Sequence, residues 1–166
     1  MILQYFKKKE NKEEIIAIEQ YNKILFESKK FLNDNNFFKE KNYQTSFEIV
    51  SIFLIMFIRK NLLEKNRKKY LKVNDELISV FISDLDESLR EKGIGDMSIG
   101  KYVKSYVKKF YFRISKFPEG NDLYKNETFI EYLKITDFMK NDDYVNVSRK
   151  FNDKFVNEII LFADNV

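Results

Sequence analysis

Basic side chains recur along residues 99–117 in a pattern that could bind an anionic partner. No acidic residue interrupts them, and at about 100° per residue they share one arc of a helix, opposite an apolar arc. The basic arc carries Lys101, Lys104, Lys108, Lys109, Arg113 and Lys116, and the apolar arc carries Val103, Val107, Phe110, Ile114 and Phe117. The pattern predicts an amphipathic helix with a basic outer face.

Three kinds of partner fit such a face: ribosomal RNA, an anionic lipid surface or an acidic protein. Tyr102, Tyr106 and Tyr111 flank the lysines, and mixtures of aromatic and basic residues occur at nucleic-acid surfaces. Aromatic residues at this spacing also suit the edge of a core, and lysines on a helix also form ordinary solvated surface. The sequence leaves these interpretations open.

A glycine-containing turn precedes the basic helix. Gly93 is expected to end the preceding helix in the left-handed conformation, which costs glycine little. Asp96 or Ser98 is expected to cap the next helix, because a side-chain oxygen there can accept from a free amide. Beside the turn, Arg90 and Glu91 could either contact a partner or fix the angle between the helices. The six residues of interest are Arg90, Glu91, Gly93, Gly95, Asp96 and Ser98.

Residue types exclude most catalytic and metal-binding chemistry. The chain has no cysteine and no histidine, so it lacks thiol nucleophiles, zinc ligands of the usual kinds and the commonest general base. The glycines at 93, 95 and 100 lack the lysine pattern and preceding strand of a nucleotide site, and the acids of residues 84–96 lack EF-hand spacing. We expect no enzyme activity, no metal and no cofactor.

Composition predicts an all-α protein. The 166 residues include one proline and four glycines, too few for a fold of many strands and turns. Apolar periodicity predicts a single-domain bundle of about five or six helices, with 1–166 as one domain and 1–11 flexible. The expected helices cover residues 12–32, 44–63, 74–92, 99–117, 121–140 and 143–163.

Residues 44–63 are the most apolar segment. Only ten uncharged residues separate Glu48 from Arg59, whereas a membrane span needs about 20. We expect a central helix buried on nearly all sides, with a membrane-resting segment as the alternative. Thr45 and Glu48 have the spacing of a capping box at its start. The basic run that follows, residues 64–72, suits a solvated helix end or a phosphate contact.

Charge is distributed unevenly along the chain. Residues 1–118 hold 24 Lys and Arg against 16 Asp and Glu, whereas residues 119–166 hold 6 against 10. This asymmetry favours an anionic partner near the basic part. The first residues, MILQYFKKKE, do not form a secretory signal, so we expect a cytoplasmic protein, peripheral to the inner membrane where its partner requires it.

Residues 89–113, LREKGIGDMSIGKYVKSYVKKFYFR, resemble the ubiquinol–cytochrome c chaperone family. The segments 21–29 and 45–48 are similar to its opening helix and to the lead into its apolar helix, so the resemblance covers roughly residues 20–140. Phe112 replaces a usual glycine, and a histidine common near Ile52 or Phe53 is missing, which indicates a divergent bacterial member. The matching motif positions are Leu89, Arg90, Glu91, Gly93, Gly95, Asp96, Ser98, Lys101, Phe110, Tyr111 and Arg113.

The resemblance implies an all-helical, non-enzymatic chaperone. It would bind newly made cytochrome b, or another precursor of the bc1 complex, and mitochondrial relatives work with a helical partner subunit. The residues expected to contact a partner are Lys101, Lys104, Lys108, Arg113, Arg90 and Glu91. The alternative is a basic helical module that binds RNA, the ribosome or a protein without a chaperone role.

Overall fold

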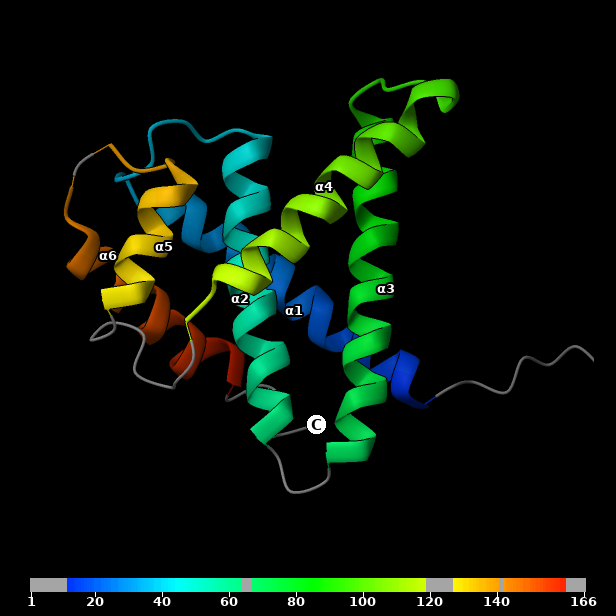
Figure 1. Ribbon diagram of the computed structural model, residues 1–166, viewed down its shortest axis with the longest axis horizontal. Helices are drawn as coiled ribbons and strands as arrows, with labels where there is room; N and C mark the ends of the chain where they lie inside the picture. The colour runs from blue at the N-terminus through cyan, green and yellow to red at the C-terminus, as the bar shows by residue number, and fades with distance from the viewer. Residues whose placement is uncertain (1–11, 64–66, 119–126, 141, 161–166) are drawn as a thin grey trace, which may run out of the picture.

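The computed structural model describes residues 12–63, 67–118, 127–140 and 142–160, and within them the chain is helical, with one isolated antiparallel bridge. Figure 1 shows the arrangement of the helices, whose buried apolar side chains form one core. The all-α prediction is confirmed, with six α-helices followed by a π-helix among the described residues. The elements are α1 (Lys12–Asp34), α2 (Tyr43–Leu63), α3 (Arg67–Glu91), α4 (Asp96–Lys116), α5 (Glu127–Thr136), α6 (Tyr144–Lys154) and η2 (Phe155–Ile160).

Helix α2 is the centre of the core. Every residue from Phe47 to Phe57 is buried, because α1, α3, α4 and η2 all pack against this helix. The expectation of a helix buried on nearly all sides is confirmed. Among the described residues, no helix is both long and apolar enough to cross a bilayer.

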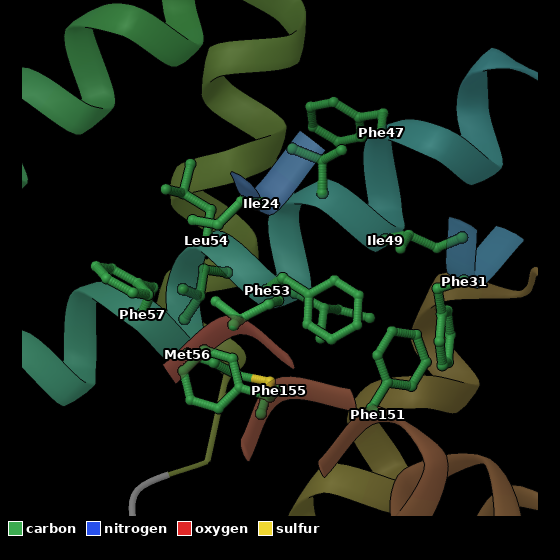
Figure 2. Close-up of a cluster of buried hydrophobic side chains, with 14 of the residues drawn as sticks. Ile24, Phe31, Phe47, Ile49, Phe53, Leu54, Met56, Phe57, Phe151 and Phe155 are labelled. Carbon is green, nitrogen blue, oxygen red and sulfur yellow. The ribbon is translucent and has the colours of Figure 1, made fainter. Parts of the chain in front are cut away.

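Aromatic rings fill the space between α2 and the C-terminal helices (Figure 2). The ring of Phe151 in α6 lies 4.5 Å from that of Phe31 and 5.3 Å from that of Phe53 in α2, centroid to centroid. Phe155 in the π-helix meets Phe57 edge-on at 6.5 Å. Each such ring stabilises the fold by about 1.5–3 kcal/mol through burial.

The start of α3 differs from the sequence prediction. We expected a helix over residues 74–92, but α3 begins at Arg67 and includes part of the basic run. Asn74 lies inside the helix and is buried, where it accepts a hydrogen bond from Asn61 at 2.8 Å and donates to the carbonyl of Ile58 at 3.1 Å. These two hydrogen bonds satisfy the side-chain amide of Asn74, so this polar group can be buried in the middle of a helix.

The start of α2 also differs from prediction. The capping box is absent, because Glu48 lies within the helix and points to other partners. Asn42 performs the capping role instead: its side-chain oxygen accepts from the Thr45 amide at 3.0 Å. The hydroxyl of Thr45 donates to the carbonyl of Glu40 at 2.7 Å. Glu48 is thereby left for a contact with α4.

A buried carboxylate joins α1 to α6. Glu27 is 2% exposed and forms ion pairs with Lys23, at 2.8 Å, and with Lys154 of α6. Burial alone would raise the pKa of Glu27, but hydrogen bonds from Lys154 and Lys23 outweigh it and lower the pKa below its ordinary value. The pair of lysines therefore keeps this buried side chain ionised.

The loops at residues 37–40 and 137–140 meet across the molecule. Phe38 and Met139 form the antiparallel bridge, in which the Lys39 amide donates to the Phe138 carbonyl at 2.7 Å and the Lys140 amide donates to the Phe37 carbonyl at 2.8 Å. This short backbone contact holds the α1–α2 connection against the end of α5.

Candidate functional site

Helix α4 has an inner and an outer face. It crosses α2 and α3 obliquely (Figure 1) and packs mainly against α3. On the inner face, Ile99 and Phe110 are buried, and the ring of Phe110 lies 4.7 Å from that of Phe81 in α3. The predicted amphipathic helix is therefore present, and its apolar arc faces the core.

Arg113 does not lie on the outer face, so its assignment to the solvent-facing basic arc was wrong. Its side chain is 6% exposed. The guanidinium donates to both carboxylate oxygens of Glu48, through Nε at 2.9 Å and through a terminal nitrogen at 2.8 Å. Bidentate pairs of this kind are strong and directional. Arg113 thus joins α4 to the buried helix α2 and is not available to an external partner.

Two further side chains complete this cluster. The Nζ atom of Lys109 lies 2.8 Å from Glu48, and Gln44 donates to the same oxygen at 3.1 Å. The ring of Tyr132 lies beside Arg113, and burial raises the pKa of its phenol, with the charge of Glu48 adding to the effect and that of Arg113 opposing it. The α2–α4 joint is therefore a largely buried ionic contact in which one carboxylate pairs with an arginine and a lysine.

The far end of α4 is also attached to α2. Arg59 donates to the carbonyl oxygens of Phe117, at 2.8 Å, and of Pro118. Carbonyls at a helix C-terminus lack intrahelical partners, and a cation there is favourable. Sequence reasoning assigned no role to Arg59 and placed Glu48 in a cap. The signal for Glu48 was its position as the only charge between Lys41 and Arg59, since a lone charge beside an apolar run needs a partner.

The outer face of α4 holds the remaining lysines. Lys101, Lys104 and Lys108 are exposed, as is Lys116, which lies about two turns beyond Lys108. Within the described residues, no ion pair involves the first three, and α4 has no acidic side chain after Asp96. Their amines are available to an anionic partner.

Large apolar side chains share this outer face. Phe112 is 48% exposed and Tyr111 is 51% exposed, while Met97 at the start of α4 is fully exposed. The Nζ atom of Lys116 lies 5.8 Å from the ring centre of Phe112. The replacement of glycine by Phe112 therefore does not disturb close packing, because the position faces outward. We define the α4 outer face as Met97, Lys101, Tyr102, Lys104, Lys108, Tyr111, Phe112 and Lys116.

The turn before α4 has the conformation expected at Gly93. Its φ is +86°, in the left-handed region. The Gly93 amide donates to the Arg90 carbonyl at 2.8 Å, and the Ile94 amide donates to the Leu89 carbonyl at 3.2 Å. This is the Schellman arrangement that satisfies the last carbonyls of a helix. Gly95 has φ −71°, which any residue can adopt.

Neither Asp96 nor Ser98 caps α4 as predicted. The N-cap is Gly95, without a side-chain cap hydrogen bond, and Asp96 instead forms an ion pair with Arg90. Arg90 also pairs with Asp86, and the hydrogen bonds that its guanidinium donates to Asp86 and to Asp96 raise the pKa of this group. Arg90 thus clamps the end of α3 to the start of α4, while Glu91 is exposed beside it.

An acidic groove runs between α1 and α3 on another part of the surface. Its volume is about 420 Å³, and Glu14, Glu76 and Glu87 line it. At its floor, Tyr21 donates to Asp84 at 2.8 Å, and burial raises the pKa of Asp84. Among the described residues, no group of acidic side chains has an arrangement that could hold a metal ion.

Comparison with known proteins assigns most of the chain to a family. The family model for ubiquinol-cytochrome C chaperones matches residues 36–148. This range contains both partners of the Glu48–Arg113 pair, the Schellman turn and all of α4, but not the segment 21–29 that also showed a resemblance. The curated proteins and the solved structures gave no match. Because the family model covers more than half of the chain, the protein belongs to the ubiquinol-cytochrome C chaperone family.

Proposed function

We propose that this protein is a non-enzymatic assembly chaperone that binds newly made cytochrome b during biogenesis of the bc1 complex. The observation that carries the proposal is the family match over residues 36–148. The internal joint of α2 and α4 supports it, because Glu48 and Arg113 lie in separate segments with family resemblance and meet at 2.8 Å.

The proposal places the protein in a bacterial cytoplasm, at the periphery of the inner membrane, where a membrane-protein client is inserted. Its contact surface is the α4 outer face, with Lys101, Lys104 and Lys108 as partner residues. Exposed apolar side chains beside lysines suit a client that is itself apolar and has charged loops. Arg90 and Glu91 border this surface, and a helical partner subunit could share it.

Affinity capture and deletion test the chaperone role. A tagged copy expressed at its natural level is expected to capture cytochrome b or another bc1 precursor. Deleting the gene is expected to lower the content of b-type haem in membranes, measured by reduced-minus-oxidised difference spectra. Unchanged bc1 content in the deletion strain, together with a capture that contains no bc1 component, would rule the proposal out.

A second candidate is an RNA-binding or ribosome-binding module. It is favoured by the lysines of α4 together with Lys68, Lys69 and Lys72, which are exposed in the first turns of α3. Binding of this kind weakens steeply with salt because cations are released from the phosphates. Charge reversal at Lys104 and Lys108 should then reduce affinity for ribosomes, and an unchanged affinity would contradict this candidate.

A further inference from the structure

The α4 outer face combines charge and apolar surface along one helix. The 21 residues of α4 extend over about 30 Å. On this length the exposed lysines alternate with Tyr102, Tyr111 and Phe112, which are each about half exposed. Neither a purely solvated face nor a core face has this composition.

The order of side chains around the helix is informative. At about 100° per residue, Phe112 stands near the middle of the exposed arc, with Lys101 and Lys108 on one side and Lys116 on the other. Met97 is exposed on the same arc at the N-terminal end. Lysines and large apolar side chains are thus interleaved on this arc, with Tyr111 and Tyr102 toward its two edges. A helix that lies in the plane of a bilayer surface presents both kinds of side chain on one face.

We propose that the α4 outer face is a membrane-surface site that binds anionic phospholipid headgroups through its lysines and inserts Phe112 and Met97 at the interface. The long lysine stems reach outward to the phosphates while their methylene groups stay beside the apolar surface. Each lysine near an anionic leaflet gains electrostatic attraction. The inference rests on the proposed function and deepens it, because it names the bilayer around the client as a partner of the same protein face.

A lipid surface suits this site better than a nucleic acid does. Single-stranded RNA is held in grooves whose aromatic residues form stacking platforms. The α4 outer face belongs to a convex helix and contributes no residue to either of two grooves elsewhere on the surface, one of which is lined by Glu14, Glu76 and Glu87. The fully exposed thioether of Met97 also has no role in binding phosphates but gains from leaving water.

The ends of α4 suit a helix that lies flat on a surface. Arg113 and Arg59 attach its inner side and its C-terminal end to α2, and Arg90 clamps its start to α3. The helix is thus held on the body of the protein with its outer side chains directed away. No rearrangement of α4 is needed for the face to meet a flat partner.

The test uses the purified full-length protein and vesicles, without any client. In flotation assays, vesicles of phosphatidylcholine containing phosphatidylglycerol are expected to bind at least about tenfold more protein than vesicles of phosphatidylcholine alone. Lys104→Glu/Lys108→Glu should remove most of this binding. The matched control is Lys29→Glu/Lys30→Glu, which changes the net charge equally at two exposed positions of α1 and should leave binding within about twofold.

Phe112→Ser tests insertion separately from charge. It should weaken binding to phosphatidylglycerol vesicles several-fold and leave the salt dependence unchanged, whereas Phe26→Ser, at an exposed phenylalanine of α1, should have no effect. Circular dichroism verifies that all four variants remain folded, as expected for outward positions.

Several results would overturn the inference. These are equal binding to both kinds of vesicle, equal losses for the two charge-reversed pairs, or full binding by Phe112→Ser. Tighter binding to polyuridylate than to vesicles, lost in Lys104→Glu/Lys108→Glu, would assign the face to RNA instead. Cytochrome b is absent from the vesicle assay, so this assay tests the lipid site alone. Failure of vesicle binding would contradict the lipid site, whereas failure to capture cytochrome b would contradict the chaperone role.

Discussion

Two buried glutamates, Glu48 and Glu27, each hold a pair of helices together, but they do so in different ways. Glu48 in α2 receives a bidentate arginine from α4, and both side chains are almost fully removed from water. Glu27 in α1 receives two lysines, whose side chains are 22% and 12% exposed. A guanidinium fixes the direction of its carboxylate, whereas ammonium groups act as mobile point charges.

The two clusters also differ in their relation to the family match. Glu48 and Arg113 lie inside residues 36–148, whereas Glu27 and Lys154 lie outside. The α2–α4 joint therefore belongs to the part of the chain that resembles the family, and the α1–α6 joint belongs to the surrounding helices. We infer that the first joint sets the position of the candidate site and that the second closes the core around it.

The largest effect is expected at Glu48. Glu48→Gln leaves the charge of Arg113 buried without a counter-ion, so the free energy of unfolding should fall by about 3–5 kcal/mol. Urea denaturation followed by circular dichroism measures the loss. Replacing both partners, in Glu48→Leu/Arg113→Met, should recover much of it. If the double variant is as unstable as the two single losses added together, the pair does not account for the coupling of α2 and α4.

A smaller effect is expected at Glu27. Glu27→Gln should cost about 2 kcal/mol, because its lysines retain some contact with water. Since the folded pKa of Glu27 is lowered from 4.5, its contribution to stability is full above that value and is lost as the pH falls through the folded pKa. The variant should therefore lose less stability between neutral and acidic pH than the natural protein does. Parallel acid profiles for the two proteins would contradict this assignment.

Lys109 separates the roles of the two cationic partners of Glu48, Lys109 itself and Arg113. Lys109→Met removes a partner that is one third exposed and keeps the bidentate arginine, so we expect a loss of about 1 kcal/mol. Thermal unfolding, compared with Glu48→Gln, measures the difference. A loss as large as that of Glu48→Gln would show that the lysine, and not the arginine, holds the joint.

The outer lysines should not contribute to stability at all. Lys104→Glu/Lys108→Glu is expected to change the free energy of unfolding by no more than about 0.5 kcal/mol. In cells, the same variant should lower the b-type haem content while the protein remains at its normal level. A loss of folded protein would show that these lysines stabilise the fold, as Arg113 does on the inner face of α4. The two faces of the helix would then not have separate roles.

Residue patterns in the sequence predicted the helices better than they predicted the partners of individual side chains. The buried centre of α2, the amphipathic α4 and the left-handed Gly93 follow from local periodicity and backbone preference, and they are confirmed. Arg113 was misplaced because periodicity assigns every cation to the solvent side, whereas the distant Glu48 compensates its burial. The prediction of one domain over residues 1–166 and of a flexible segment at 1–11 stays a prediction, and the latter lies outside the described residues.

Capping predictions failed for a related reason. Asp96, Asn74 and Glu48 all have the residue types of helix caps, and each is engaged in a tertiary contact. Local sequence shows which hydrogen bonds a side chain can make, but the packed fold decides among them. The α4 lysines remain predictions as partner contacts, since exposure shows only that they are available.

The backbone contact between residues 37–40 and 137–140 has a consequence for the order of folding. The salt bridge within it joins Lys39 to Asp137, 98 positions away. Closing so large a loop has a high entropic cost, which favours contacts that form after the intervening helices have compacted. The amide hydrogens of Lys39 and Lys140 should consequently exchange with solvent before those of α2. Their exchange rate would report the local opening in which the C-terminal helices separate from the core.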